Sequence, residues 1–514
     1  MKNMRALSIS FLLILTLIQL SAGAQSKFSY TISIPDPSSE SYQVEMTISD
    51  VNSESLVLKM PKWMPGYYQI MDYAKDVRDL TAKNGNGESL TVSQLNDNTW
   101  EVASGSVEQV KVSYTVEAKR AFVAVSKVDE EHAYIAPCNT YLYVDGMLNN
   151  PAEVNVILPS QWKDVATGLH PVKGTSSKFK AENFDFLYDC PILIGNLEEL
   201  PAFEVHGIEH RFIGYKVGEF DKVGFMAKLQ KSVEAAVELM GDIPYKHYTF
   251  LAIGPGMGGI EHLNSTTISF DGNNLRSHEA ENRILSFITH EYFHHYNVKR
   301  IRPVELGPFD YDRENRTTQL WVSEGLTVYY EYVVLKEAGL LTSDEFMQAY
   351  SNEITAAEND PGKEYQSLTE SSFRTWDEGP FGITAGEDHS ISYYVKGPVA
   401  GLLLDFAIRH NSNNKQSLDD VMRYLYNHFY KELGRGFTDA EVQQACEVAA
   451  GAKLDEVFEY ITTTRPLDYK KYLGYAGLKL AEHKNEKGNT SYKLERLDDV
   501  SEEQQTILQS WLRE

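Results

Sequence analysis

The sequence predicts a multidomain α+β protein in which an N-terminal antiparallel β-sandwich precedes an α/β domain and a helical subdomain. The chain has 514 residues, which is too long for a single hydrophobic core. Short alternating runs such as SYTISI and QVKVSYTVEA fill the first part, and turn clusters such as PDPSSES separate them, which is typical of a sandwich. From about residue 204 the apolar residues instead recur with the period of a helix.

Helical patterns dominate the rest of the chain. The run FDKVGFMAKLQKSVEAAVELMG predicts an amphipathic helix that ends at Gly241, and HYTFLAIGPG predicts a buried strand with a glycine turn after it. From about Leu473 onward, one or two short strands and a terminal helix are expected. The expected helices between these parts span 279–298, 319–337, 343–357, 394–409, 417–432 and 438–450.

The first 24 residues have the pattern of a secretory signal peptide. Lys2 and Arg5 supply the basic start, residues 6–20 the apolar stretch, and residues 22–24 the small-residue cleavage site. The apolar stretch is short for a transmembrane helix, and no other segment approaches the roughly 20 apolar residues that a span requires. We therefore expect a soluble exported protein, periplasmic or extracellular, that begins at Gln25; an uncleaved N-terminal anchor is the alternative.

These changes of pattern divide the chain into a signal peptide and further segments. No internal repeat or low-complexity tract stands out. The expected segments are the signal peptide over 1–24, the β-sandwich domain over 25–200, the α/β domain over 201–335, a helical part over 336–470 and a short C-terminal segment over 471–514.

The charge and the cysteines restrict the function. The formal net charge is −25, and removing Lys2 and Arg5 makes it −27, which argues against nucleic acids and anionic membranes as partners. Cys138, Cys190 and Cys446 form neither a disulfide framework nor the paired spacing of a thiolate zinc site. Export permits one disulfide, for which Cys138 and Cys190 are the favoured pair.

The motif THEYFHH, residues 289–295, predicts a metal site. On a helix, His290 and His294 lie one turn apart on one face, which suits two nitrogen ligands of one zinc ion. In the H-E-x-x-H arrangement Glu291 does not bind the metal but accepts a proton from the water that the metal activates. His295 falls about 100° off the ligand face and is not counted as a ligand. The alternative is a helix whose histidines only form hydrogen bonds or face solvent.

A third ligand is expected from TQLWVSEGLTVYYEYVVLKEAG. This helix is apolar almost throughout, yet Glu324 and Glu331 lie on it two turns apart on nearly the same face. Burying a carboxylate is costly unless it is paired or bound to a metal. We therefore predict Glu324 as the third ligand and Glu331 as a hydrogen-bond acceptor that orients a ligand or the substrate amine, with an interhelix ion pair as the alternative for Glu331.

Together these motifs resemble the gluzincin metallopeptidases, and within them the glycyl aminopeptidase family, distant relatives of aminopeptidase N. The gluzincin resemblance rests on two motifs, HEYFH at residues 290–294 and WVSEGL at residues 321–326. NVKRIRP (297–303), WMPGYY (63–68), which is similar to the family's W-x-P-G-x-Y, and GGIEH (258–262), in the place of G-x-M-E-N, carry the closer one. The resemblance covers roughly residues 27 to 475 and implies a thermolysin-like catalytic domain, one zinc ion and aminopeptidase activity with a preference for N-terminal glycine or alanine.

The resemblance also has departures. Ser323 and His262 stand where aminopeptidase N relatives usually have Asn, and both substitutions look usual for the glycyl aminopeptidase branch. Many members of that branch end in a PDZ domain, whereas the last 40 or so residues here are too few for a complete one.

Two further stretches are expected to contact the substrate. GPGMGGIEHLNSTTISF predicts a glycine-rich turn at Gly258 and Gly259 that leads into an edge strand, where backbone groups can pair with an extended peptide. Glu261 on that edge can hold the substrate's ammonium through a charge-assisted bond, unless it is a surface carboxylate. Tyr394 resembles the tyrosine of the Y-x-K-G motif of aminopeptidase N relatives, whose hydroxyl helps to stabilise the oxyanion, unless its ring only packs at the start of a helix; Tyr393 is the neighbouring candidate.

The leading hypothesis is thus a zinc aminopeptidase that acts on peptides with a free N-terminus. Two alternatives remain. The first is an exported zinc endopeptidase of the same fold, which would cleave N-terminally blocked peptides. The second is a surface protein that binds peptides or glycans and holds only a structural metal, although a packed turn explains WMPGYY better than an aromatic platform does.

Overall fold

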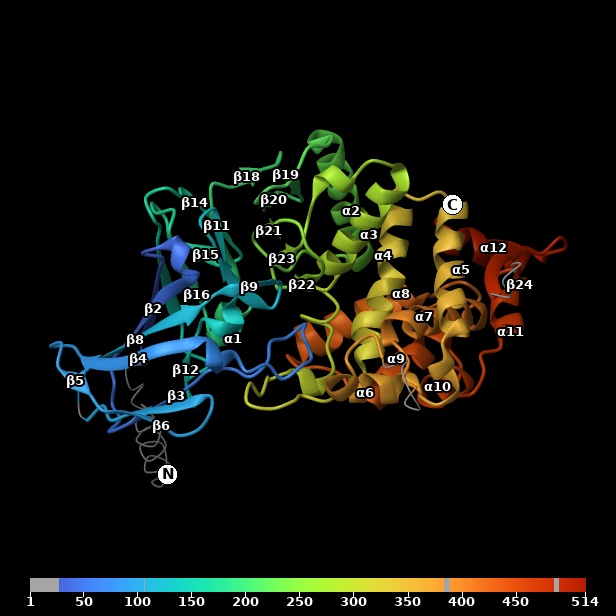
Figure 1. Cartoon of the computed structure of the whole chain (residues 1–514). Helices are drawn as coiled ribbons and strands as arrows, with labels where there is room; N and C mark the ends of the chain where they lie inside the picture. Colours follow the sequence, from blue (N-terminus) through green and yellow to red (C-terminus); the bar gives the residue numbers. More distant parts are fainter. Residues whose placement is uncertain (1–26, 106, 383–388, 485–489) are drawn as a thin grey trace, which may run out of the picture.

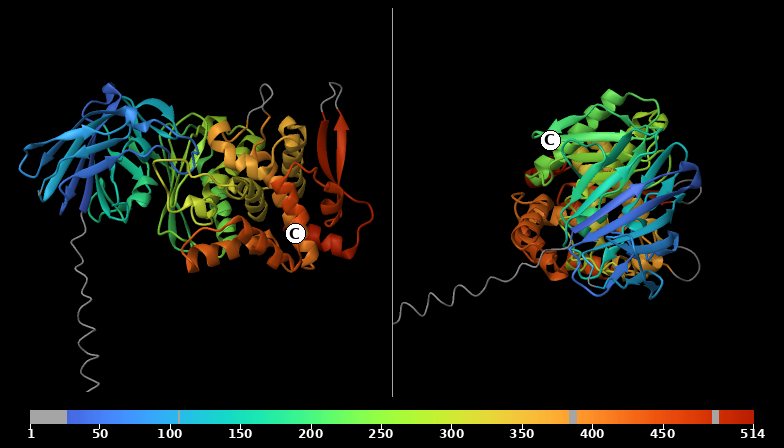
Figure 2. Two further views of the ribbon diagram at one scale, coloured as in Figure 1. Left: turned by 90° about the horizontal axis from the view of Figure 1, so that it is seen from below. Right: turned by 90° about the vertical axis from the view of Figure 1, so that its left-hand side faces the viewer.

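The computed structural model describes residues 27–105, 107–382, 389–484 and 490–514. The expected signal peptide lies outside these residues. Sheets fill one end of an elongated molecule and helices the other (Figures 1 and 2). Within the described residues, every helix is too short or too polar to pass through a lipid bilayer.

The N-terminal part contains an eight-stranded sheet. Side chains alternate between buried and partly exposed along its central strands, because successive residues of a strand point to opposite faces. In spatial order the strands are β15 (His170–Pro171), β16 (Lys178–Ala181), β13 (Ala152–Ile157), β1 (Lys27–Ser33), β2 (Ser41–Ser49), β8 (Gln109–Glu117), β4 (Val77–Asn84) and β5 (Ser89–Leu90).

Two smaller sheets share one hydrophobic core with the eight-stranded sheet. The five-stranded sheet has the order β14 (Asp164–Thr167), β17 (Ile192–Gly195), β11 (His132–Ile135), β10 (Val125–Val128) and β9 (Lys119–Phe122). The four-stranded sheet has the order β12 (Tyr143–Val144), β3 (Leu56–Lys59), β7 (Thr99–Val102) and β6 (Val92–Gln94).

Two details differ from expectation in this domain. Strands β1 and β13 pair in parallel, so the large sheet is not wholly antiparallel; β13 is reached by a long connection and not by a hairpin, which leaves its direction free. Cys138 and Cys190 are free thiols, so the favoured disulfide is wrong. Both are buried in the domain's core, where Cys138 Sγ donates to the Ala124 carbonyl oxygen, 3.0 Å away.

A fourth sheet begins after β17 and carries one edge of the cleft described below. Its strands β20, β21 and β23 are parallel, and β22 pairs with β23 in the antiparallel direction at the edge. The order is β18 (Glu198–Glu199), β20 (Ile208–Gly214), β21 (Tyr248–Ala252), β23 (Ser265–Ile268) and β22 (Gly259–Glu261), with β19 (Phe203–Val205) paired to β20.

One hydrophobic core joins this sheet to all the later helices and to the C-terminal segment. Trp511 packs against Phe346, Tyr350 and Phe406, so the last residues are part of the body of the molecule. The helices and the final hairpin are α1 (Phe184–Tyr188), α2 (Lys222–Met240), α3 (His278–Phe293), η6 (Trp321–Gly325), α4 (Leu326–Glu337), α5 (Ser343–Asn359), α6 (Leu368–Glu378), α7 (Tyr393–Asn411), α8 (Leu418–Tyr424), η8 (Leu425–Glu432), α9 (Asp439–Ala450), α10 (Asp455–Thr462), α11 (Tyr469–Gly474), β24 (Leu478–Lys484), β25 (Thr490–Arg496) and α12 (Glu502–Trp511).

The multidomain α+β class is confirmed, and two helices near the cleft differ from their expected form. Helix α3 ends at Phe293 and not at residue 298. His294 is its C-cap, and the residues after it form turns. The helix expected over 319–337 begins as a π-turn, η6, before it continues as α4. Single π-turns of this kind often occur at functional sites. Helices α6, α10 and α11 were not expected from the sequence.

Candidate active site

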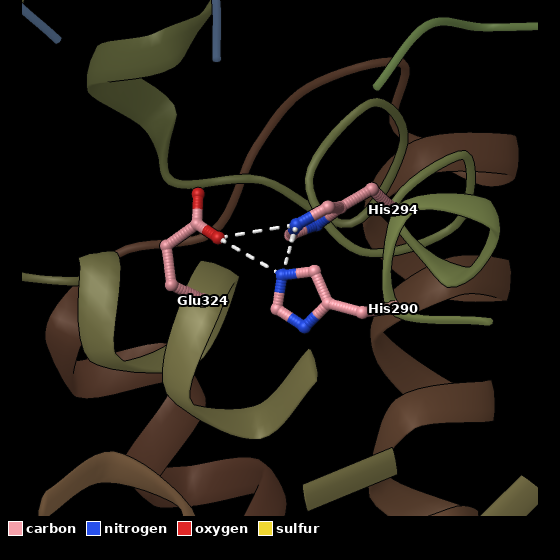
Figure 3. Close-up of side chains that lie close together, drawn as sticks. All are labelled: His290, His294 and Glu324. Carbon is pink, nitrogen blue, oxygen red and sulfur yellow. Dashed lines mark hydrogen bonds and ion pairs between the residues drawn. The ribbon is translucent and has the colours of Figure 1, made fainter. Parts of the chain in front are cut away.

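Three side chains from two helical segments converge at the centre of a cleft (Figure 3). His290 lies in the last turn of α3, His294 caps that helix, and Glu324 projects from the π-turn η6. His294 Nε2 lies 3.1 Å and His290 Nε2 3.8 Å from Glu324 Oε2, and the two Nε2 atoms lie 2.9 Å apart. All three side chains are buried. The spatial arrangement that the spacing predicts is therefore present.

The hydrogen bonds around the histidines leave both Nε2 atoms free for a cation. His290 Nδ1 donates to Glu331 Oε2 at 2.9 Å, and His294 Nδ1 donates to the Asn297 carbonyl oxygen at 2.6 Å. Because a carboxylate and a carbonyl only accept, each Nδ1 carries the proton and each Nε2 keeps its lone pair. Glu324 Oε2 is buried and accepts no hydrogen bond from the residues that the structure describes. Two imidazoles, one carboxylate and room for a fourth ligand fit a catalytic zinc site.

The electrostatics of the site also favour a cation. Burial lowers the pKa of His290, but the nearby carboxylates of Glu324 and Glu331 outweigh this effect and raise it to about 10, so a positive charge is favoured between these side chains. A second group, Glu261 with Glu291 and His294, also brings its ligand atoms within 4.8 Å of one another. Both groups require His294 Nε2, because Nδ1 of that ring is already bonded. The two groups therefore cannot each hold an ion at the same time.

Glu291 lies beside the three converging side chains and under the edge strand β22. Burial raises the pKa of Glu291 to about 7, against the lowering effect of His290 and His294. A Cβ atom on Gly259 would lie 2.6 Å from the Glu291 carboxyl carbon. Glycine at this position thus lets the strand backbone approach the carboxylate, as a general base beside an extended substrate requires.

Glu331 holds His290 in place. Its Oε1 accepts from Ser286 Oγ at 2.9 Å and its Oε2 from His290 Nδ1, so the carboxylate is fixed from both sides. A carboxylate on the far nitrogen of a ligating histidine fixes the ring orientation and raises its basicity. The predicted orienting contact is thus to His290.

Tyr394, at the start of α7, lines the cleft, whereas its neighbour Tyr393 does not. Tyr393 is buried and its hydroxyl bonds Thr375 Oγ1 at 2.9 Å. Burial and then Glu324 raise the pKa of Tyr394 well above its usual value, so its hydroxyl stays a neutral donor. Gly325 and Gly397 allow the π-turn η6 and helix α7 to touch, since a Cβ on Gly325 would lie 2.6 Å from the Gly397 Cα. This contact fixes Tyr394 relative to Glu324.

Glu261 closes one end of the cleft. It is buried on β22, and Lys299 Nζ lies 3.8 Å from its Oε1. A Cβ on Gly66, from the WMPGYY loop of the N-terminal domain, would lie 2.6 Å from Glu261 Oε2. The loop backbone therefore bounds the space beside this carboxylate. The possibility that Glu261 is a surface carboxylate is wrong.

Three residues near the site were not assigned a role from the sequence. Burial and then Glu324 and Glu261 raise the pKa of Tyr68 well above its usual value, which places this tyrosine beside both carboxylates. Lys299 pairs with Asp189 at 2.9 Å. Tyr68 belongs to the WMPGYY motif and Lys299 to the NVKRIRP motif. The resemblance to the family therefore marked both positions in the sequence, but it gave neither residue a chemical role.

The cleft has a volume of about 750 Å³ and extends from Gly66 and Glu261 past the histidines to helices α3, α4 and α5. The walls from α3 to α5 carry apolar side chains, among them Phe287, Val328, Leu335 and Leu341, and polar side chains of α3 and α5 also line them. The cleft thus has a carboxylate beside Gly66 and a mixed apolar and polar surface along these helices.

Comparisons with known proteins agree with this geometry. A model of the Peptidase M61 N-terminal domain matches residues 29–196, and a model of the M61 glycyl aminopeptidase matches residues 283–400. A search of curated proteins finds no match.

Solved structures share the fold. The aminopeptidase N family protein from Idiomarina loihiensis has 29% identity and a TM-score of 0.83, over 89% of this chain and 79% of that one. The M1 zinc metallopeptidase from Deinococcus radiodurans has 13% identity and a TM-score of 0.53, over 86% and 96%. A variant of the latter, solved with a Tyr-Ser-Ala substrate, has 14% identity and a TM-score of 0.54, over 86% and 95%. With both domain models matched in order and the three side chains converged, the chain is a metallo-aminopeptidase of the M61 glycyl aminopeptidase family.

Proposed function

We propose that this metallo-aminopeptidase is exported, holds one zinc ion with His290, His294 and Glu324, and releases glycine or alanine from the free N-terminus of peptides. The observation that carries the proposal is the convergence of two Nε2 lone pairs and one unbonded carboxylate oxygen. Because His294 Nε2 is shared by the two groups of donor atoms, the site suits a single ion.

The protein's own residues divide the chemistry among them. A zinc ion held by the three ligands supplies Lewis-acid polarisation of the scissile carbonyl and of the attacking water. Glu291 accepts the proton of that water and delivers it to the leaving amine, for which a pKa of about 7 is well matched. The neutral hydroxyl of Tyr394 donates to the oxygen that becomes negative in the tetrahedral intermediate.

The closed end of the cleft supports the exopeptidase register. Glu261 accepts the substrate's ammonium there, which places the first peptide bond beside Glu291. The backbone at Gly66 lies so close to Glu261 that little space remains for the first side chain, which supports a preference for glycine or alanine. The residues after the cleaved bond extend along helices α3 and α4, past Phe287 and Leu335.

The Glu291→Gln variant tests the reaction. It keeps the shape of the side chain but cannot accept a proton, so kcat on alanine p-nitroanilide should fall by roughly 10²- to 10⁴-fold while zinc content stays at the wild-type level. An unchanged rate in a zinc-loaded variant would disprove the mechanism. Equal cleavage of acetylated and free peptides by the wild-type enzyme would instead support the endopeptidase alternative.

Export has its own test. The basic start, the apolar stretch and the small-residue site predict cleavage before Gln25. Mass spectrometry of the protein recovered outside the cytoplasm should therefore find this N-terminus, and recovery of an intact Met1 chain in the cytoplasm would contradict export.

A further inference from the structure

A buried charge network lies behind the end of the cleft where Glu261 closes it. Lys299 Nζ lies 2.9 Å from Asp189 Oδ1 and 3.8 Å from Glu261 Oε1. The exposed fractions of the Asp189, Lys299 and Glu261 side chains are only 11%, 6% and 5%. Since solvent screens these charges little, their mutual distances decide how strongly each one attracts a further charge.

The lysine is bound to Asp189 and not to Glu261. At 2.9 Å the first contact is a charge-assisted hydrogen bond, whereas 3.8 Å exceeds a hydrogen bond. Glu261 Oε1 is accordingly buried without a hydrogen-bond partner among the described residues. The two carboxylates and the one ammonium sum to one negative charge. One substrate ammonium neutralises it.

Asp189 is itself held firmly in this position. It follows α1 in the N-terminal domain, and its Oδ2 accepts from the Leu263 backbone N–H at 2.6 Å, two residues after Glu261. Its Oδ1 also lies 3.4 Å from His262 Nδ1. Burial alone would lower the pKa of Lys299, but Asp189 and then Glu261 outweigh burial and raise it. Lys299 therefore remains charged and needs an acceptor.

We propose that Asp189 is a positioning residue for amine recognition: it holds the Lys299 ammonium away from Glu261 and so leaves the Glu261 carboxylate free for the substrate's ammonium. The inference rests on the proposed role of Glu261 as the amine anchor. It makes the N-terminal domain part of the specificity of the enzyme. In Asp189→Asn, Lys299 loses its ionised partner, and the nearest carboxylate that remains is Glu261.

A matched pair of inhibitors measures this effect directly. Alanine hydroxamate carries the amine, and propionohydroxamate lacks only that group. The ratio of their inhibition constants in the wild-type enzyme reports the amine anchor, and a charge-assisted contact corresponds to roughly 10- to 100-fold. Asp189→Asn should reduce this ratio by about tenfold or more, through weaker binding of alanine hydroxamate alone. On alanine p-nitroanilide the same loss should appear in KM, with kcat nearly unchanged.

A double variant separates positioning from a merely structural role. Asp189→Asn with Lys299→Met removes the ion pair from both sides, so Glu261 is again free and the inhibitor ratio should return toward wild type. If the double variant keeps the loss, the proposal is overturned. Lys299→Met alone removes the cation near Glu261 and should retain or increase the ratio; a lower ratio in this variant would overturn the proposal even if Asp189→Asn does not fold.

A control and the remaining outcomes complete the test. Asp405→Asn breaks an equally buried ion pair, Asp405 with Arg409 at 2.8 Å, away from the cleft, and should leave the ratio unchanged. Undiminished amine selectivity in a folded Asp189→Asn protein would overturn the inference while the proposed function stands. Equal inhibition of the wild-type enzyme by both compounds would instead remove the amine anchor itself.

Discussion

Helix α4 borders two buried polar clusters that differ in how their charges are matched. On one side Tyr329 and Tyr330 donate to Asp405 and Asp419 at 2.8 and 3.2 Å. Arg409 and Arg513 neutralise these two carboxylates, each at 2.8 Å. On the other side lies the cleft with Glu291, Glu324 and Glu331, where no described residue donates a hydrogen bond to Glu324 Oε2.

The difference shows which buried charges stabilise the fold and which are kept for a ligand. A buried carboxylate with a cation and a hydrogen-bond donor is satisfied by the protein itself. A carboxylate without either costs free energy until something else binds. Burial of polar groups alone therefore does not mark the site; the unmatched negative charge around His290 and His294 does. The experiments below change one cluster at a time.

Removal of the metal should have the largest effect. A chelator should reduce the hydrolysis of alanine p-nitroanilide by roughly 10³-fold or more, since zinc supplies both the activated water and the stabilisation of the oxyanion. Added zinc should restore the rate. The melting temperature should fall on chelation and recover with zinc, because a ligand that binds only the folded state stabilises it. Full activity of a demonstrably metal-free protein would refute the account.

In the satisfied cluster, Asp405→Asn should reduce stability without touching the chemistry. Breaking a buried ion pair leaves Arg409 uncompensated and should lower the free energy of unfolding by about 3 to 5 kcal/mol. Denaturant unfolding measures the loss. Zinc content and KM should match the wild type, and a large change in KM would show that the two clusters are coupled.

Glu331→Gln should weaken zinc without unfolding the protein. Because the amide no longer supplies a charged acceptor to His290 Nδ1, we expect zinc affinity to fall by about 10- to 100-fold. Competition with a chelator of known affinity gives the value. Glu353→Gln is the matched control, since Glu353 is a neighbouring carboxylate that bonds Tyr332 and not a histidine.

How much the sequence predicted depends on how local the interactions are. The His290, His294 and Glu291 set follows from helical spacing, and Glu324 from a charge within an apolar run. The pairing of Asp189 with Lys299 joins residues 110 positions apart, and nothing in a single sequence matches one charge with another over that distance. The π-turn at η6 was missed for another reason, because it changes the helical period for one turn only.

The smallest expected effect concerns Glu353, at the border of the cleft. Burial, followed by repulsion from Glu331, raises the pKa of Glu353 to about 7. Between its unfolded pKa, about 4.3, and this value the folded state binds more protons, so stability should fall as pH rises from about 4.3 to about 7 and change little above that. Glu353→Gln removes this decline and should make the protein more stable than wild type at pH 8, by about 1 to 2 kcal/mol, since solvent still reaches part of the side chain. An equal dependence on pH in both proteins would contradict the shift.

The most direct measurement is anomalous X-ray diffraction at the zinc edge on crystals of the active enzyme. We expect one peak per chain between His290 Nε2, His294 Nε2 and a Glu324 oxygen, about 2.0 to 2.2 Å from each. A peak at other residues, or none in a protein that hydrolyses peptides, would contradict the assignment of these three side chains as the metal site.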